Sequence, residues 1–301
     1  MHEYANWYRS ILQNMDNDIL SFHTFTLPSQ KIMQRMRSVR PKKNLGQHFL
    51  TDLNIAKAIA DTVDACPEFP ILEVGPGMGV LTQYLVKKNR PLKAVEIDRE
   101  SVAYLEEHFA FLEENIIGED FLRMDLNKLF DGAQFVLTGN YPYDISSQIF
   151  FKMLDNKDLI PCCTGMIQKE VAERIASNPG TKAFGILAVM IQAWYNVEYL
   201  FTVDENVFNP PPKVKSAVIR MTRNETTDLG CDEVLFNRMV KSVFNQRRKM
   251  LRVSLKQMFT GNMPDTDFFA QDVMTKRPEQ LTIQQLVELT NMVEKQLMLK
   301  G

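Results

Sequence analysis

The segment ILEVGPGMGVL, Ile71 to Leu81, constrains the fold of this chain more than any other. It begins as an apolar run that is typical of a buried strand, carries Glu73, and then has glycine at alternate positions, Gly75, Gly77 and Gly79. Glycine adopts positive φ without steric cost and lets a ligand approach bare main chain. A strand, a glycine turn and a helix start are typical of a nucleotide-type site at the carboxyl end of a parallel sheet. A tight turn without a ligand is the alternative.

Length and composition indicate a soluble globular protein. The 301 residues are enough for one large domain and a smaller one. The net charge is −2, so any surface for nucleic acid must be local. No apolar run approaches the roughly 18 residues that span a membrane, and the N-terminus lacks a signal pattern. We therefore expect a cytoplasmic protein without a membrane segment.

The cysteines and histidines suggest no metal site. None of the four cysteines has C-x-x-C spacing, and the four histidines do not cluster with them. Free thiols in a reducing compartment are the expected state, and neither zinc nor a disulfide framework is predicted. The cysteines are Cys66, Cys162, Cys163 and Cys231.

After the glycine turn the pattern alternates between helix and strand, which predicts an α/β fold. Glu96 ends the expected strand 92–98, at the distance from Gly75 where dinucleotide-type folds place a ribose-binding acid. Two carboxylate oxygens match two vicinal hydroxyl donors, although a surface carboxylate after a strand is the alternative. Asp120 follows a further short strand, and its carboxylate can accept from an adenine amine.

The motif NYPY, Asn140 to Tyr143, ends the expected strand 133–140. Pro142 removes a backbone donor and restricts the residue before it, which leaves carbonyl oxygens unpaired near the Asn140 side chain. Two acceptors at one spot can hold an exocyclic amine through both hydrogens, while Tyr143 stacks on the base. An ordinary polar turn with a packed tyrosine is the alternative. Asp144 is the expected cap of the next helix.

Further along the chain, VFNPPPKVKSAVIRM contains three consecutive prolines, which predict a rigid extended loop. Phe208 lies at its rim, either as a core residue or as half of an aromatic sandwich. From residue 224 the pattern is helical only. A cationic helix over 243–256 is expected to turn Met250 to the core and its charges either to solvent or to phosphate. The candidate RNA-binding cations are Lys42 and Lys43 in a basic lead-in segment, and Arg247, Arg248, Lys249 and Arg252.

Glycine spacing identifies the cofactor class. A dinucleotide fingerprint would need glycine at position 80, which is Val80. The pattern present, E-x-G-x-G-x-G, is the one methyltransferases use for S-adenosylmethionine, and it argues against a nicotinamide oxidoreductase. NYPY then indicates an amine on a nucleobase as methyl acceptor.

Seven ordered motifs resemble the KsgA-type small-subunit ribosomal RNA adenine dimethyltransferases, from about Arg40 to the C-terminus. They are KKNLGQHFL, ILEVGPGMGVLT, VEID, GNYPYDIS, QKEVAERI, FNPPPKVKSAV and FNQRRKMLR. The resemblance implies a Rossmann-like class I S-adenosylmethionine-dependent methyltransferase domain over 39–223 and a smaller all-helical RNA-binding domain over 224–301. Residues 1–38 match nothing in the family and are expected to be a flexible extension.

The resemblance also implies the reaction and its partner. Members dimethylate N6 of two adjacent adenines in a hairpin loop near the 3′ end of small-subunit (16S) RNA, late in ribosome assembly. An immature small subunit is the implied partner, and a monomer is expected.

Site residues follow motif by motif from the same resemblance. The implied cofactor-binding residues are His48 and Leu50 at the methionine end, Gly75 and Gly77 in the loop, Glu96 at the ribose, Asp120 at the adenine amine, and Asn140. The implied catalytic residues are Asn140, Pro142, Tyr143 and Phe208. Two positions depart from the family: His48, where many bacterial members have asparagine, and Tyr141, often leucine, which we expect to narrow the entrance.

Two other functions remain open. The related large-subunit RNA methyltransferases that confer macrolide resistance are the nearest rival, against which the FNQRRK segment and the long helical tail argue. An assembly factor that binds RNA without catalysis is the other, against which the glycine loop and NYPY argue.

Overall fold

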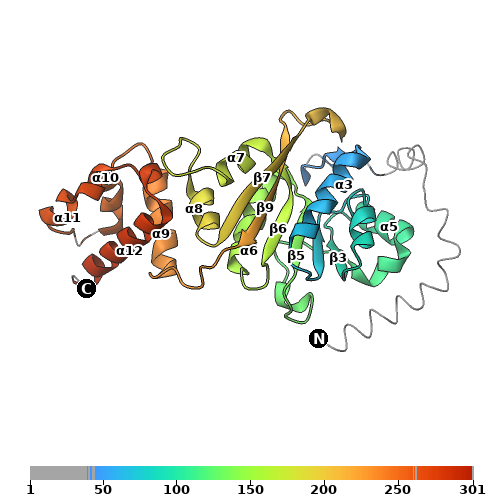
Figure 1. Cartoon of the computed structure of the whole chain (residues 1–301), viewed down its shortest axis with the longest axis horizontal. Coiled ribbons are helices and arrows are strands. Elements are labelled where there is room, and N and C mark those ends of the chain that lie inside the picture. Colours follow the sequence, from blue (N-terminus) through green and yellow to red (C-terminus); the bar gives the residue numbers. More distant parts are fainter. Residues whose placement is uncertain (1–38, 40, 43–44, 260, 262, 300–301) are drawn as a thin grey trace.

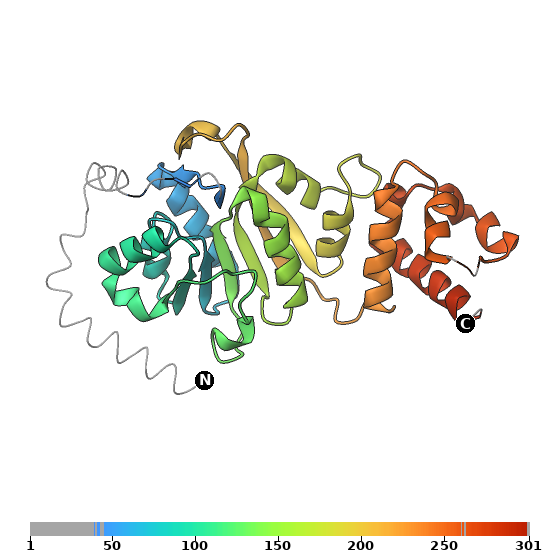
Figure 2. The same cartoon turned by 180° about the vertical axis from the view of Figure 1, so that it is seen from behind.

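The computed structural model describes residue 39, residues 41–42, 45–259 and 261, and residues 263–299. A mixed sheet with flanking helices forms the larger part, and a group of helices lies at one end of the elongated molecule (Figure 1). The view from behind shows the same separation (Figure 2). The extension expected over residues 1–38 lies outside the described residues, and so does Lys43.

The main sheet has seven strands in the order β4-β3-β2-β5-β6-β9-β7. The first five strands in this order pair in parallel, whereas β9 pairs antiparallel with both β6 and β7. All carboxyl ends of the parallel strands therefore meet at one edge, where ligands bind in open α/β sheets. The strands are β2 (Ile71–Val74), β3 (Leu92–Val95), β4 (Ile116–Ile117), β5 (Val136–Asn140), β6 (Cys162–Gln168), β7 (Tyr195–Val203) and β9 (Ser216–Arg223).

Apolar side chains cover both faces of this sheet, because strand residues alternate in direction. Ile71 lies in one hydrophobic cluster with α3 and α4, and its neighbour Leu72 lies in another with α6 and α7. The predicted α/β fold is thus confirmed. The helices of this part are α3 (Leu53–Asp61), α4 (Thr82–Leu85), α5 (Arg99–His108), α6 (Ser146–Asp155), α7 (Lys169–Ile175) and α8 (Ile186–Gln192).

Two helices begin directly after a residue whose side chain caps them. The Asp52 carboxylate accepts from the main-chain N–H groups of Asn54 and Ile55 and caps α3. Thr282 caps the last helix, with Gln285 completing a capping box. Asp144 is a wrong prediction, because Tyr143–Ile145 forms a 3₁₀ turn and α6 begins after it, at Ser146, without a side-chain cap.

The C-terminal part is helical, and its core forms against α8. Leu251, Leu286 and other apolar residues of these helices join Val189 of α8 in one buried cluster. The helices are α9 (Glu233–Asn245), α10 (Leu251–Ser254), α11 (Thr266–Ala270) and α12 (Ile283–Met298).

A second, two-stranded sheet joins segments that are far apart in sequence. Strand β1 (Phe49–Leu50) pairs antiparallel with β8 (Phe208–Asn209), with Leu50 opposite Phe208. Thr51 extends this contact, since its N–H and its hydroxyl both donate to the Val207 carbonyl, at 2.8 and 2.9 Å. The segment before α3 is therefore fixed to the start of the proline-rich loop.

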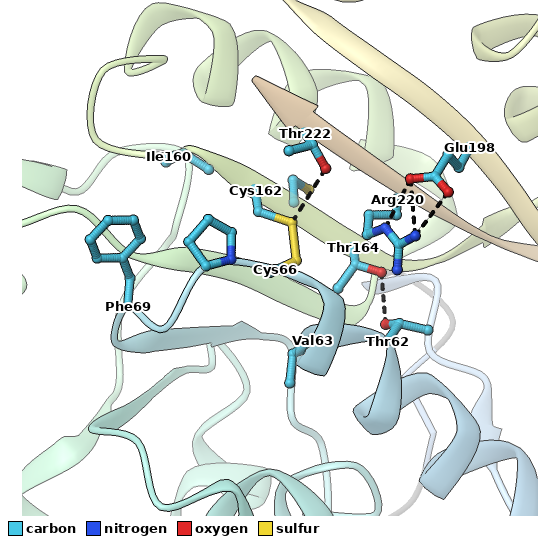
Figure 3. The surroundings of a disulfide bond; sticks show 12 residues. Thr62, Val63, Cys66, Phe69, Ile160, Cys162, Thr164, Glu198, Arg220 and Thr222 are labelled. Atoms are coloured by element: carbon cyan, nitrogen blue, oxygen red, sulfur yellow. Dashed lines mark hydrogen bonds and ion pairs between the residues drawn. A yellow bond between two sulfur atoms is a disulfide. The ribbon is translucent and has the colours of Figure 1, made fainter. Parts of the chain in front are cut away.

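Two of the four cysteines form a disulfide, so the prediction of free thiols is wrong for Cys66 and Cys162. Their Cα atoms lie 5.8 Å apart although 96 positions separate them in sequence. Cys66 follows the turn after α3 and Cys162 opens β6, and Figure 3 shows Thr62 and Thr164 bonded beside them. Sequence spacing could not reveal a pair that only the packing of α3 on β6 creates. Cys163 and Cys231 are free thiols, as expected.

Candidate active site

The glycine turn after β2 faces the NYPY motif at the carboxyl edge of the sheet. Gly75 and Gly77 have φ of +70° and +57°, which L side chains rarely adopt. A Cβ on Gly75 would lie 3.7 Å from Pro142 Cδ and 3.9 Å from the Asn140 carbonyl oxygen. A Cβ on Gly77 would lie 3.2 Å from the Phe49 ring. The bare main chain therefore borders both the NYPY motif and the segment before α3.

Glu96 follows β3 directly and is 5% exposed. Its Oε2 accepts from the Gly77 N–H at 3.0 Å, and its Oε1 accepts from the Asp98 N–H at 2.9 Å. Burial raises the pKa of this carboxyl group, and the two N–H donors partly offset that rise. Each oxygen keeps a further lone pair, so the carboxylate can hold the glycine turn and still accept from two hydroxyl groups.

Glu73, in the same motif, is a buried acid. It is 1% exposed, and its Oε2 accepts from the Thr82 hydroxyl at 2.7 Å. Burial raises its pKa to about 8, which the Thr82 hydroxyl opposes and the nearby Glu96 charge increases. The sequence showed the position of Glu73 but gave no reason to expect a neutral acid there.

Asp120 lies in the loop after β4, on the same edge of the sheet. Its Oδ1 accepts from the Leu122 N–H at 2.9 Å, and its Oδ2 lies 3.4 Å from Nε of Arg123, an exposed side chain. The carboxylate itself is about one-third exposed, with a side-chain accessibility of 32%. It is accessible to a ligand donor, in line with its predicted contact to an amine.

Asn140 is oriented by the segment that carries His48. Its Nδ2 donates to the His48 carbonyl at 3.4 Å, which turns Oδ1 the other way. Among the described residues, neither Asn140 Oδ1 nor the Tyr141 carbonyl accepts a hydrogen bond. Pro142, which has no N–H, follows directly. The structure thus places two acceptors without donors side by side in the chain, as the motif predicts.

The aromatic residues of the site are only partly where the sequence suggested. Tyr143 stacks on His48, with ring centroids 5.6 Å apart and an interplanar angle of 28°, and its hydroxyl bonds to the Ser216 hydroxyl. Burial raises the pKa of Tyr143. Phe208 is 4% exposed and belongs to the cluster of Leu50 and Val80, so in this structure it is a core residue. Ser216 was missed because nothing in sequence relates it to Tyr143.

Tyr141 does not narrow the entrance, and that expectation was wrong. The side chain is 1% exposed and points into the core, where its hydroxyl donates to the Thr164 carbonyl at 3.0 Å and contacts Cys163 Sγ. Gly139 and Gly165 make room for the ring. A Cβ at Gly165 would come within 2.6 Å of it and within 2.3 Å of the Gly139 carbonyl.

Lys42 is held by acids beside the glycine turn. Its ammonium lies 2.5 Å from Asp98 Oδ1 and 3.0 Å from Glu100 Oε1, and these partners raise its pKa. Gln47 donates to the other Asp98 oxygen at 3.2 Å. The charge of Lys42 is thus compensated locally rather than offered to phosphate. Asp98 and Gln47 were missed by sequence reasoning, although Asp98 stands where a cap of α5 is expected.

The basic segment near Arg247 is a turn, not part of a helix as predicted. Helix α9 ends at Asn245 and α10 begins at Leu251. Arg248, Lys249 and Arg252 are exposed. Met250, expected in the core, is 40% exposed. Arg247 donates to the Lys182 carbonyl and lines a pocket of about 380 Å³ that also contains Arg277.

The fold and this edge of the sheet define a class I S-adenosylmethionine-dependent methyltransferase. The sheet order, the E-x-G-x-G-x-G turn and the acid after β3 fit a cofactor that has a sugar and an amino-acid tail but no pyrophosphate. The bare main chain at Gly75 and the remaining carboxylate lone pairs of Glu96 are the features that fit that cofactor.

The chain belongs to the ribosomal RNA adenine dimethylase family, whose model matches residues 39–295. A ribosomal RNA small subunit methyltransferase A from Phocaeicola vulgatus is 70% identical over 86% of this chain and 91% of its own length. The protein of the same name from Bacteroides fragilis is 68% identical over 87% and 95%. The enzyme therefore dimethylates adenine in ribosomal RNA with S-adenosylmethionine as methyl donor.

Solved structures agree with this fold. A dimethyladenosine transferase from Plasmodium falciparum superposes with a TM-score of 0.70 at 24% identity, covering 83% of this chain and 98% of its own. The 23S rRNA methyltransferase ErmE superposes with a TM-score of 0.57 at 26% identity, covering 82% and 99%. Within the described ranges, no helix is long and apolar enough to cross a bilayer, and no three metal-binding side chains cluster.

Proposed function

We propose that this enzyme dimethylates N6 of two adjacent adenines in a hairpin loop near the 3′ end of small-subunit ribosomal RNA. The names of the relatives at 70% and 68% identity support the small subunit as target. The substrate is an immature small subunit, and the enzyme acts as a cytoplasmic monomer. The observation that carries the proposal is the pair of free acceptors, Asn140 Oδ1 and the Tyr141 carbonyl, beside Gly75.

S-adenosylmethionine supplies an electrophilic methyl group on a sulfonium sulfur. Its methionine end would be held by His48, Leu50, Gly75 and Gly77. Glu96 would accept from the ribose hydroxyl groups, and Asp120 would accept from the adenine amine. Gly75 and Gly77 leave room because they carry no side chain. These residues fix the donor at the edge of the sheet where NYPY ends.

The acceptor residues activate the amine by orientation and charge. The lone pair of an adenine amine is delocalised into the ring, which makes it a poor nucleophile. Asn140 Oδ1 and the Tyr141 carbonyl accept both amine hydrogens, draw density onto nitrogen and aim its lone pair at the methyl. Tyr143 stacks on the base, which must leave its own stack. Phe208 is buried here. It would contact the opposite face of the base only after the segment that covers Phe208 moves.

RNA contact away from the target base falls to the turn between α9 and α10. Arg248, Lys249 and Arg252 are exposed there, and Arg247 lies beside them. Exposed cations suit phosphate contact and produce salt-dependent affinity. We assign RNA binding to this turn and to the helical part over 224–301 that carries it.

Methyl transfer to small subunits that lack these methyl groups tests the proposal. With labelled S-adenosylmethionine we expect label in small-subunit RNA, and mass spectrometry should find N6-dimethyladenine at two adjacent positions. Large-subunit RNA serves as the control acceptor. Transfer to that RNA, with none to small subunits, would identify the enzyme as a relative of ErmE in function as well as fold.

The amine clamp is tested by Asn140→Ala. Loss of one oriented acceptor should lower the transfer rate by about 100-fold or more, as removal of one transition-state hydrogen-bonding group does in other enzymes. Calorimetry should show that S-adenosylhomocysteine still binds. Asn196→Ala, on the exposed edge strand β7, is the matched control and should keep the wild-type rate. A near-normal rate for Asn140→Ala would refute the clamp.

A further inference from the structure

His48 touches three parts of the acceptor site at once. Its carbonyl accepts from Asn140 Nδ2 at 3.4 Å, and its ring stacks on Tyr143. Its Nδ1 lies 2.8 Å from the Pro210 carbonyl. Because that carbonyl can only accept, Nδ1 carries the proton and donates. One side chain therefore joins the segment before α3 to the NYPY motif and to the proline-rich loop.

The proline-rich loop, residues 209–215, is fixed at both ends to this site. At its start, β8 pairs with β1, and His48 bonds to Pro210. At its end, Ser216 bonds to the Tyr143 hydroxyl. Between these anchors the loop is largely exposed, with Lys213 and Lys215 at its surface. A loop held in this way can move as a unit only if the His48 segment or Tyr143 moves with it.

The anchors connect two different binding functions. The segment His48–Leu50 lies beside the glycine turn, since the Phe49 ring covers Gly77. Tyr143 is the residue proposed to stack on the base, and Ser216 at the end of the loop bonds to its hydroxyl. Main-chain pairing of β1 with β8 joins the two sides, and the His48 ring adds a side chain that contacts both the loop and Tyr143.

We propose that His48 is a positioning residue that couples the two sites, so that cofactor bound beside His48–Leu50 strengthens RNA binding through the proline-rich loop. The inference rests on the proposed function, because it takes RNA as the ligand of that loop. Cofactor contact stabilises one position of the segment, and the His48–Pro210 bond transmits that position to the loop. Since coupling free energy is reciprocal, bound RNA strengthens cofactor binding by the same factor.

The coupling is measured with an RNA hairpin that carries two adjacent unmethylated adenines in its loop. Fluorescence anisotropy gives the RNA Kd of the full chain, with and without saturating S-adenosylhomocysteine. We expect the wild-type protein to bind RNA at least about fivefold more tightly with the cofactor product, the lower end of common allosteric factors. Calorimetry with and without RNA should return the same factor for S-adenosylhomocysteine.

His48→Phe isolates the contact, because phenylalanine keeps a ring over Tyr143 and lacks the donor to Pro210. We expect its ratio of RNA Kd values to fall to within about twofold of one. His108→Phe is the matched control, since His108 Nδ1 and its ring both contact Tyr104 of its own helix. A merely structural role for His48 would weaken RNA binding equally with and without cofactor, leaving the ratio unchanged.

A wild-type ratio near one, or a wild-type ratio retained by His48→Phe, would overturn the inference. Methyl transfer by the wild-type enzyme to unmethylated small subunits is measured in parallel. Its absence would count against the proposed function, whereas normal transfer with an unchanged ratio in His48→Phe would count against the coupling alone.

Discussion

Glu73→Gln should make the protein more stable at neutral pH and should remove part of its pH dependence. Burial raises the pKa of Glu73 from an ordinary 4.5 to about 8, so the folded protein keeps its proton where the unfolded chain has lost it. Folding stability from this group is fully present below pH 4.5 and is lost as pH rises towards 8. At about 1.4 kcal/mol per pH unit, the loss across this interval is roughly 5 kcal/mol.

Glutamine resembles the protonated acid and does not titrate, and its amide oxygen can still accept from Thr82. Urea unfolding of the cofactor-free protein at several values between pH 5 and 8 gives the free energy of unfolding. The difference between variant and wild type should widen in favour of Glu73→Gln as pH rises. Glu68→Gln, an exposed position, is the control and should run parallel to wild type. Parallel curves for Glu73→Gln itself would show that Glu73 is ionised in the fold.

Three further predictions concern the disulfide, the buried tyrosine and the basic turn. The Cys66–Cys162 disulfide closes a loop of 96 positions, so Cys66→Ser or added reductant should lower the free energy of unfolding by about 3–5 kcal/mol. Cys231→Ser is the control. Four reactive thiols in the denatured, unreduced protein would contradict the prediction. Tyr141→Phe leaves the Thr164 carbonyl without its tyrosine donor and should lower the free energy of unfolding in urea by about 1–3 kcal/mol. Tyr199→Phe removes an exposed hydroxyl and should lower it by less than about 0.5 kcal/mol. Equal losses would refute the anchoring role of the Tyr141 hydroxyl. Arg248→Glu combined with Lys249→Glu should reduce the slope of log RNA affinity against log salt concentration by about 1 to 2. Lys128→Glu, at an exposed site in the sheet part, should leave the slope unchanged. An unchanged slope in the double variant would show that the turn does not contact phosphate.

Local chemistry carried the prediction of the fold and of the cofactor edge. The strand around Glu73, the turn at Gly75 and Gly77, and the acid at Glu96 all depend on residues close together in sequence. Positive φ at the glycines and a carboxylate after a buried strand are both typical of ligand sites at the carboxyl edge of such sheets. These features could therefore be predicted correctly from the sequence.

Contacts between distant segments were the part that sequence reasoning could not supply. The direction of the Tyr141 side chain depends on glycines in two strands. The Cys66–Cys162 bond depends on how α3 packs on β6. The Arg247 region was expected to be helical because its apolar spacing fits a helix, but α9 ends before it and Met250 turns outward. The spacing of apolar residues does not show where one helix ends and the next begins when both helices continue the same spacing.

The glycines at 139 and 165 have a consequence for attempts to move this motif between enzymes. The aromatic ring at position 141 needs glycine at 165 on β6, where a Cβ would come within 2.6 Å of it, so the four letters NYPY are not an independent unit. In a homologue with alanine at position 165, the added Cβ would collide with the ring and with the Gly139 carbonyl of the neighbouring strand. Exchange of acceptor motifs among these methyltransferases must therefore transfer the paired strands β5 and β6 as one block.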